Sequence, residues 1–97
     1  MIPRSEVYAA IDSERDYQDR VWAENNPANP THPTDPRPLS IGEDILLIEE
    51  YARRARAKWT GELRPEIGAL DIIRKIAGIA VRCMETHGAP KRPGDTP

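Results

Sequence analysis

The chain has 97 residues, which is the size of one small domain. Its formal net charge is −2, so it lacks the overall positive charge that unspecific binding to duplex nucleic acid requires. The single cysteine excludes an internal disulfide, and the sequence has no secretory signal and no apolar run of about 18 residues, so we expect a cytoplasmic protein with no membrane partner.

The first predicted helix covers residues 5–24. Ser5 is a suitable N-cap, and Glu6 is favourable in the first turn because it faces the positive end of the helix dipole. The apolar side of this helix is sparse and consists of Val7, Ala10, Ile11, Val21 and Trp22. The helix therefore has an apolar face, but a thin one.

Two polar residues, Glu14 and Gln18, fall on this apolar side, where a core is expected. A buried carboxylate needs a partner, because an unpaired buried charge is expensive. Two interpretations stay open. Either Glu14 pairs with Arg74 or Lys75 of the last helix and anchors the first one, or Glu14, Tyr17 and Gln18 line a cleft.

A proline-rich linker follows at residues 25–39. Its prolines recur at every third position, at Pro27, Pro30, Pro33 and Pro36. Such spacing forbids a helix and favours an extended polyproline-II strap or a disordered loop. We expect the linker to act as a spacer.

The second predicted helix covers residues 40–60. Ser40 and Glu43 have the S-x-x-E spacing of a capping box, and Gly61 suits the position beyond the C-terminus. The heptad-like series that should pack on the last helix is Ile41, Ile45, Ile48, Ala52, Ala55 and Trp59.

The third predicted helix covers residues 65–87, with Pro65 at its first position and Gly88 at its end. A short turn folds it back on the second helix as an antiparallel hairpin. Residues 88–97 are expected to form a flexible tail. The predicted architecture is a single all-α domain over residues 1–97, made of an N-terminal helix, a proline-rich strap and a two-helix hairpin.

The third helix has more apolar surface than one neighbour can cover. Its apolar residues form an arc of roughly 200° at helical spacing. The surplus indicates a homo-oligomer, because the rest of the chain offers few apolar residues to cover it. The residues that we expect at the subunit interface are Ile72, Ile76, Ile79 and Cys83.

Gly78 interrupts the interior of this helix, where glycine costs about 1 kcal/mol relative to alanine. Its presence predicts that another helix or a ligand approaches the backbone closely, and helix contact is the favoured interpretation.

No pattern of residues indicates catalysis, a metal or a cofactor. Cys83 lies inside the apolar arc, which favours a core thiol over a nucleophile, and the two histidines and one cysteine do not have the spacing of a zinc site. Acidic residues of the second helix form one of the two carboxylate motifs that a nucleotide pyrophosphatase of the MazG type needs, and the third helix does not supply the second.

Basic and aromatic residues lie near one another on the predicted helices, in a pattern that indicates a binding site for an anion. Guanidinium groups bind phosphate through paired hydrogen bonds, and aromatic rings stack on bases. A site for a nucleotide-like anion is predicted where the first helix crosses the hairpin. The candidate ligand-binding residues are Arg15, Tyr17, Gln18, Trp22, Arg74 and Lys75.

Two segments resemble a family of small proteins common in phage and prophage genomes. They are ERDYQD at 14–19, followed by Trp22, and IRKIAGIAVRCMETHGAPKR at 73–92. The resemblance implies a phage origin and an infected bacterial cell as the location. Short helical phage proteins often counter host immunity, and some are oligomeric sponges for cyclic-nucleotide or ADP-ribose-derived signals. The chain is similar to those sponges in size and hairpin character.

The expected function is therefore that of a phage accessory protein that sequesters a nucleotide-derived immune signal without catalysis. The first alternative is an inhibitor that binds a host defence protein. The second alternative is the MazG-like nucleotide pyrophosphatase.

Overall fold

The computed structural model describes residues 1–25 and 38–94, except for the side chains of residues 22–25. Three helices make up this part of the chain, with no strand between them: α1 (Arg4–Asn25), α2 (Ile41–Gly61) and α3 (Pro65–His87). The predicted all-α class is confirmed. The prolines of the predicted strap and the last three residues of the predicted tail lie outside the described residues. Of the three helices, none is long and apolar enough to span a lipid bilayer.

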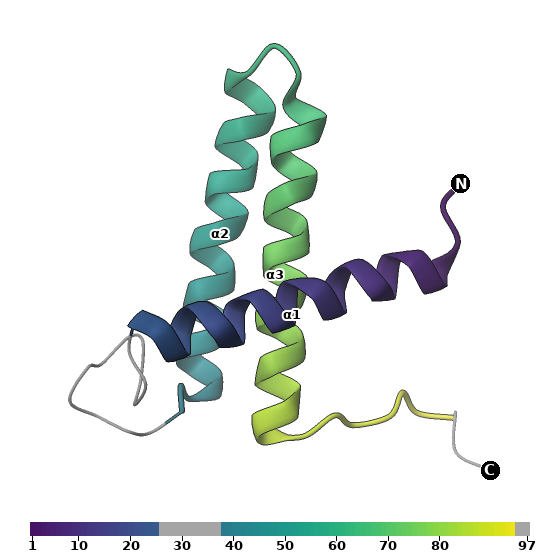
Figure 1. Ribbon diagram of the computed structural model, residues 1–97, viewed down its shortest axis with the longest axis vertical. Helices are drawn as coiled ribbons and strands as arrows, with labels where there is room; N and C mark the ends of the chain where they lie inside the picture. The colour runs from purple at the N-terminus through teal and green to yellow at the C-terminus, as the bar shows by residue number, and fades with distance from the viewer. Residues whose placement is uncertain (26–37, 95–97) are drawn as a thin grey trace.

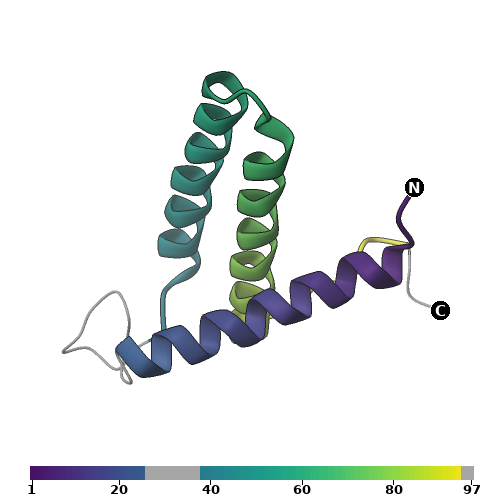
Figure 2. The same ribbon diagram turned by 45° about the horizontal axis from the view of Figure 1, so that its top comes forward.

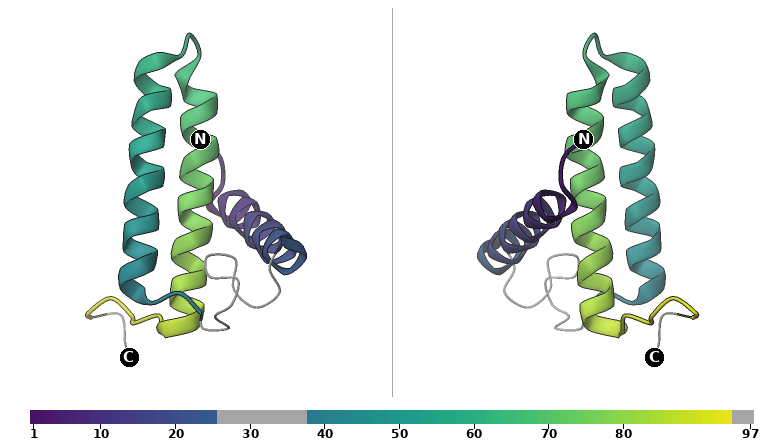
Figure 3. Two further views of the ribbon diagram at one scale, coloured as in Figure 1. Left: turned by 90° about the vertical axis from the view of Figure 1, so that its left-hand side faces the viewer. Right: turned by 90° about the vertical axis from the view of Figure 1, so that its right-hand side faces the viewer.

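The helices form a pair with a third helix laid across it (Figure 1). α2 and α3 lie side by side and run in opposite directions, joined by a short turn at 62–64. α1 crosses α3 on the side away from α2, as two perpendicular views show (Figures 2 and 3). The arrangement is open: the radius of gyration is 15.2 Å, against about 12.5 Å for a compact chain of this length.

Local signals in the sequence set the start of α2 and both ends of α3. α1 begins at Arg4, so Ser5 lies inside its first turn and is not its N-cap, contrary to the prediction. The backbone N–H of Glu43 donates to Ser40 Oγ, and the N–H of Ser40 donates to Glu43 Oε1, both at 3.1 Å, so the predicted capping box is present. α3 begins at Pro65 and ends before Gly88, whose φ of 125° suits glycine and whose N–H donates to the Met84 carbonyl. Gly61 is the last residue of α2 and does not lie beyond it.

The contact between α2 and α3 differs from the predicted heptad series. Asp44 is the most buried residue of α2, 1% exposed, and it forms an ion pair with Arg82 of α3. Because this pair is buried, the face of α2 that meets α3 differs from the predicted face. Ile41, Ile45 and Trp59, which were expected at the contact, are each at least half exposed. The series that faces α3 consists of Asp44, Ile48, Tyr51 and Ala55, all buried or half-buried.

The contact between α1 and α3 is mainly polar. Glu14, Arg15 and Gln18 are buried, and α1 approaches α3 most closely at Gly78. A Cβ atom on Gly78 would lie 2.8 Å from Gln18 Nε2, so the predicted close approach of another helix is confirmed. Glu14 accepts a hydrogen bond from Arg74 Nε at 2.9 Å, which confirms the interpretation in which this carboxylate anchors the first helix.

Apolar side chains of α3 face two directions. Ile72 and Ile79 are buried against the rest of the protomer, and Ile76 and Cys83 are half-buried, so the first two are not available to a second subunit in this fold. The large apolar side chains of α3 that are exposed are instead Met84 near its end and, in its first half, Ile67, Leu70 and Ile73. The last three adjoin α1 along a largely apolar groove of about 540 Å³, lined by Val7, Ala10, Ile11, Ile67, Leu70, Asp71, Ile73, Arg74 and Ala77.

Candidate functional site

A cleft of about 340 Å³ opens where α1 crosses the helix pair. It draws side chains from all three helices and from the segment before α2. They are Glu14, Tyr17, Gln18, Val21, Leu39, Leu47, Tyr51, Lys75, Ile79 and Arg82. We call this space the crossing cleft. Its position depends on Gly78, because a larger residue there would push α1 away from α3.

Gln18 is the polar centre of the crossing cleft. Its Nε2 donates to Glu14 Oε2 at 3.1 Å and to the backbone carbonyl of Lys75 at 3.3 Å, which fixes the orientation of the amide. The Oε1 atom is buried, and no donor among the described residues reaches it. A buried acceptor without a donor costs about 1–3 kcal/mol. Gln18 therefore presents an acceptor that a ligand N–H would satisfy.

Two tyrosines border the crossing cleft. Tyr17 is half exposed, and the guanidinium of Arg20 lies 5.7 Å from the centre of its ring. Tyr51 is half-buried, and the guanidinium of Arg54 lies 5.0 Å from its ring. Arginines at these distances hold the rings by cation–π attraction. The two rings supply the flat apolar surface on which a planar ligand group stacks.

The cations of this region have carboxylate partners. Arg74 hydrogen-bonds Glu14 and Asp71, and the bond to Glu14 is the main reason why the pKa of Arg74 is raised. Partial burial alone would raise the pKa of Asp71, but hydrogen bonding to Arg74 and the charges of Arg74 and Lys75 hold it below its usual value. Lys75 Nζ lies 3.7 Å from Asp71 Oδ2, the longest of these contacts.

The structure brings together four of the six predicted ligand-binding residues. Tyr17, Gln18 and Lys75 line the crossing cleft, and Arg74 lines an adjoining hollow of about 550 Å³ that shares Glu14, Tyr17 and Lys75 with it. The side chain of Trp22 lies outside the described residues.

Arg15 lies outside both spaces. It is buried between Asp19 of α1 and Glu85 of α3, with contacts of 2.9 and 2.8 Å. Burial opposes its charge, but the hydrogen bonds that Arg15 donates to these two carboxylates outweigh burial and raise the pKa of Arg15. Arg15 therefore fastens α1 to the C-terminal half of α3.

Sequence reasoning left Tyr51 and Arg82 out of the site. Tyr51 of α2 and Arg82 of α3 both line the crossing cleft, on the faces that the buried Asp44–Arg82 pair brings together. The sequence pattern did not indicate that this charged pair is buried. The acidic residues of α2 have separate roles, because Glu43 caps the helix and Glu50 binds Arg53 and Arg54. These bonds lower the pKa of Glu50 to about 2. Among the described residues, the carboxylates of α2 do not gather into a metal-binding group of their own.

Comparison of the chain with family models, with curated proteins and with solved structures gives no match.

Proposed function

We propose that this protein binds a nucleotide-like small molecule in the crossing cleft and releases it unchanged. The observation that carries the proposal is that Gln18, a residue that lines the cleft, has a buried Oε1 atom with no donor among the described residues. Nucleobases carry ring and exocyclic N–H groups that are suited to such an acceptor. Binding would therefore remove a cost that the free protein bears.

Other residues of the cleft fit the remaining parts of such a ligand. The half-exposed ring of Tyr17 offers a stacking surface for the base, and Lys75 offers a cation for a phosphate. The nearby carboxylates Glu14 and Asp71 balance much of the positive charge. This balance favours a ligand with few phosphates, such as a cyclic nucleotide or an ADP-ribose derivative, over a triphosphate.

The biological setting of the proposal rests on the resemblance to small phage proteins. In that setting the protein sequesters an immune signal in the infected cell, and tight binding without turnover is sufficient for the role.

Assembly into a homo-oligomer is part of the proposal. The apolar groove between α1 and α3 leaves Leu70 62% exposed and Ile73 53% exposed on adjacent turns, next to Val7 and Ile11 of α1. A second copy would cover them in a symmetric contact. Sedimentation should show a dimer or larger species for the wild type and a monomer for Leu70→Glu. Leu46→Glu, which changes an equally exposed leucine outside the groove, should leave the assembly intact.

The groove also supports a second candidate function, an inhibitor that binds a host protein. An apolar groove flanked by Asp71 and Arg74 is suited to an amphipathic helix of a partner. A wild-type monomer that forms a defined complex with one host protein, and loses it in Leu70→Glu, would favour this function over self-assembly.

The ligand proposal is tested with a panel of cyclic dinucleotides, cyclic mononucleotides and ADP-ribose derivatives. A bound ligand should raise the unfolding temperature and be recovered unchanged by mass spectrometry. Lys75→Met should weaken its binding about 10- to 100-fold, from the loss of a charge-assisted contact of about 1.5–3 kcal/mol. Lys58→Met, which removes an exposed lysine paired with Glu62 outside the cleft, is the matched control.

Tyr17→Leu tests the stacking surface, with Tyr8→Leu as its control, because both tyrosines lie on α1 and only Tyr17 lines the cleft. Tyr17→Leu should weaken binding and Tyr8→Leu should not. No stabilisation by any member of the panel, or equal losses in variant and control, would count against the crossing cleft as the ligand site.

A further inference from the structure

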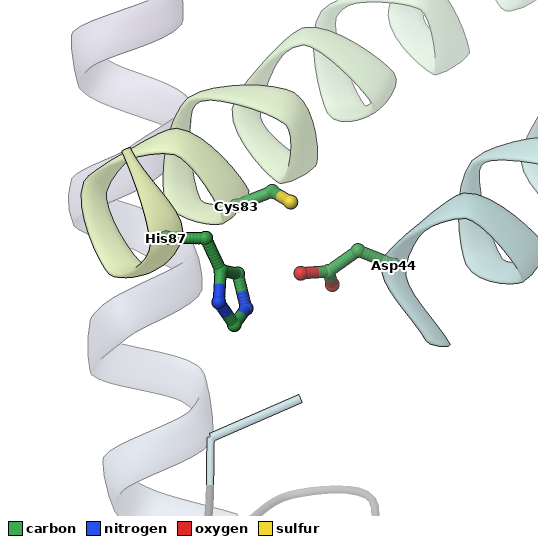
Figure 4. Close-up of side chains that lie close together, drawn as sticks. All are labelled: Asp44, Cys83 and His87. Carbon is green, nitrogen blue, oxygen red and sulfur yellow. The ribbon is translucent and has the colours of Figure 1, made fainter. Parts of the chain in front are cut away.

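Three side chains that are typical metal ligands meet at the open end of the helix pair. Asp44 lies in the first turn of α2, and Cys83 and His87 lie one turn apart at the end of α3. One ligand atom of each residue lies within 4.8 Å of the others. Figure 4 shows the three side chains in the space between the start of α2 and the end of α3, with the carboxylate directed toward the imidazole ring and the thiol beside them. We propose that this cluster is a zinc-binding site that joins the start of α2 to the end of α3.

The geometry requires a small adjustment to hold zinc. In a tetrahedral site, bonds of about 2.0–2.3 Å place neighbouring ligand atoms roughly 3.3–3.8 Å apart. The three atoms must therefore approach one another by about 1 Å, which rotations of Cys83 and His87 can supply because both side chains are partly or fully exposed. Their spacing of four residues places them on the same face of α3.

The surroundings of the cluster hold its members in place. Asp44 is buried, and the guanidinium of Arg82 binds its Oδ1 atom. His87 Nε2 lies 2.8 Å from the carbonyl oxygen of Leu39. Nε2 is also the ring nitrogen on the side of Asp44 in Figure 4, so a bound metal would replace the Leu39 carbonyl at this atom. Both contacts orient ligand groups without requiring a metal.

The donor set fits a borderline metal such as Zn²⁺. One thiolate, one imidazole and one carboxylate are ligands that zinc accepts, whereas Mg²⁺ and Ca²⁺ prefer oxygen alone. Burial, followed by the neighbouring carboxylate of Asp44, raises the pKa of the Cys83 thiol. Binding of Zn²⁺ forms the zinc–sulfur bond and releases the thiol proton to solvent. The thiolate and the carboxylate carry two negative charges, and because the Arg82 guanidinium also binds Asp44, the occupied site keeps one net positive charge. A water molecule takes the fourth position.

The site would strengthen the end of the helix pair that lies opposite the turn. The turn at 62–64 joins α2 and α3 at one end, and at the other end the two helices are held by the Asp44–Arg82 pair and by the contact of His87 with Leu39. Leu39 also lines the crossing cleft. A metal at this end would fix one wall of that cleft, but the metal site does not depend on the proposed ligand.

The test uses the full-length protein, reduced and freed of metal with a chelator, and titrated with Co²⁺ as a spectroscopic probe of the zinc site. One equivalent should produce a sulfur-to-cobalt charge-transfer band and the intense visible bands of a tetrahedral site, and Zn²⁺ should displace both. At a hundredfold excess over its dissociation constant, Zn²⁺ should raise the unfolding temperature by about 10 °C.

His87→Gln is the main variant because the side chain is exposed and its loss leaves the Asp44–Arg82 pair intact. It should abolish the cobalt bands and the stabilisation by zinc. Cys83→Ser should remove the charge-transfer band while circular dichroism shows a helical protein. His32→Gln, which changes the only other histidine, should keep both effects. Absence of the bands in the wild type, or their persistence in His87→Gln, would overturn the proposal.

Discussion

Replacing Gly78 by alanine should destabilise the protein, although alanine is the better helix former by about 1 kcal/mol. The new Cβ atom would lie 2.8 Å from Gln18 Nε2 and 3.0 Å from Glu14 Cγ, closer than carbon and nitrogen atoms pack. Gln18 can relieve the overlap only by leaving the acceptors on Glu14 and Lys75. Those two hydrogen bonds contribute about 2–3 kcal/mol together, since one acceptor is charged. The expected net loss is about 1–2 kcal/mol.

Urea unfolding of Gly78→Ala measures this loss, and hydrogen exchange of backbone amides locates it. Exchange should become faster throughout α1 and change less in α2 and α3, because the substitution weakens the crossing and leaves the contact between α2 and α3 intact. Gly61→Ala is the control, since a Cβ there meets nothing within 4 Å. The control should gain about 0.4–1 kcal/mol. If Gly78→Ala gains stability as well, and α1 stays protected, the close crossing at Gly78 is wrong.

Three further predictions concern the helix ends and the ion pairs. Ser40→Ala should cost about 1 kcal/mol in urea unfolding through loss of the capping box. Arg82→Met should cost about 3–5 kcal/mol, because it leaves the buried carboxylate of Asp44 without its cation. Hydrogen bonding to Arg74 is the main reason why the pKa of Asp71 is lowered. The Asp71–Arg74 pair should therefore add to the free energy of unfolding above about pH 4, and this contribution should disappear as the pH falls further and Asp71 becomes protonated. Asp71→Asn should flatten the acid limb of the stability profile, and an unchanged limb would refute the coupling.

The start of α2 and both ends of α3 were predictable from the sequence because they depend on local chemistry, whereas Ser5 and Gly61 lie inside α1 and α2 rather than beyond them. The Ser40 and Glu43 pair forms a capping box wherever the helix begins, and Pro65 and Gly88 restrict the backbone on their own. Gly78 was also informative, because glycine inside a helix lowers its stability and is expected where another helix packs close to the backbone. These signals located the helices and the crossing point.

The faces of the helices were harder to predict, because they depend on which charges are buried in pairs. Apolar periodicity assigned Ile41, Ile45 and Trp59 to the contact with α3, and the buried Asp44–Arg82 pair turns that series outward. Nothing in the pattern of either helix alone indicates that these two charges meet.

The candidate sites show the same limit. The spacing of Cys83 and His87 was visible in the sequence, but the third ligand of that cluster comes from the start of α2, so it could be found only once the helices were placed. The Gln18 acceptor was likewise invisible until its two hydrogen bonds fixed the amide.

The polar crossing and the exposed apolar groove have one physical origin. α1 uses Glu14 and Gln18, rather than its apolar residues, to contact α3, so Val7 and Ile11 are left along the groove beside Leu70. Buried ion pairs specify geometry but add little net stability, because the charges must first lose their hydration. The crossing cleft is therefore bounded by a helix that is well oriented and weakly held. A second copy that covers the groove would press α1 onto α3, and the affinity of the cleft for its ligand would then depend on assembly of the protein.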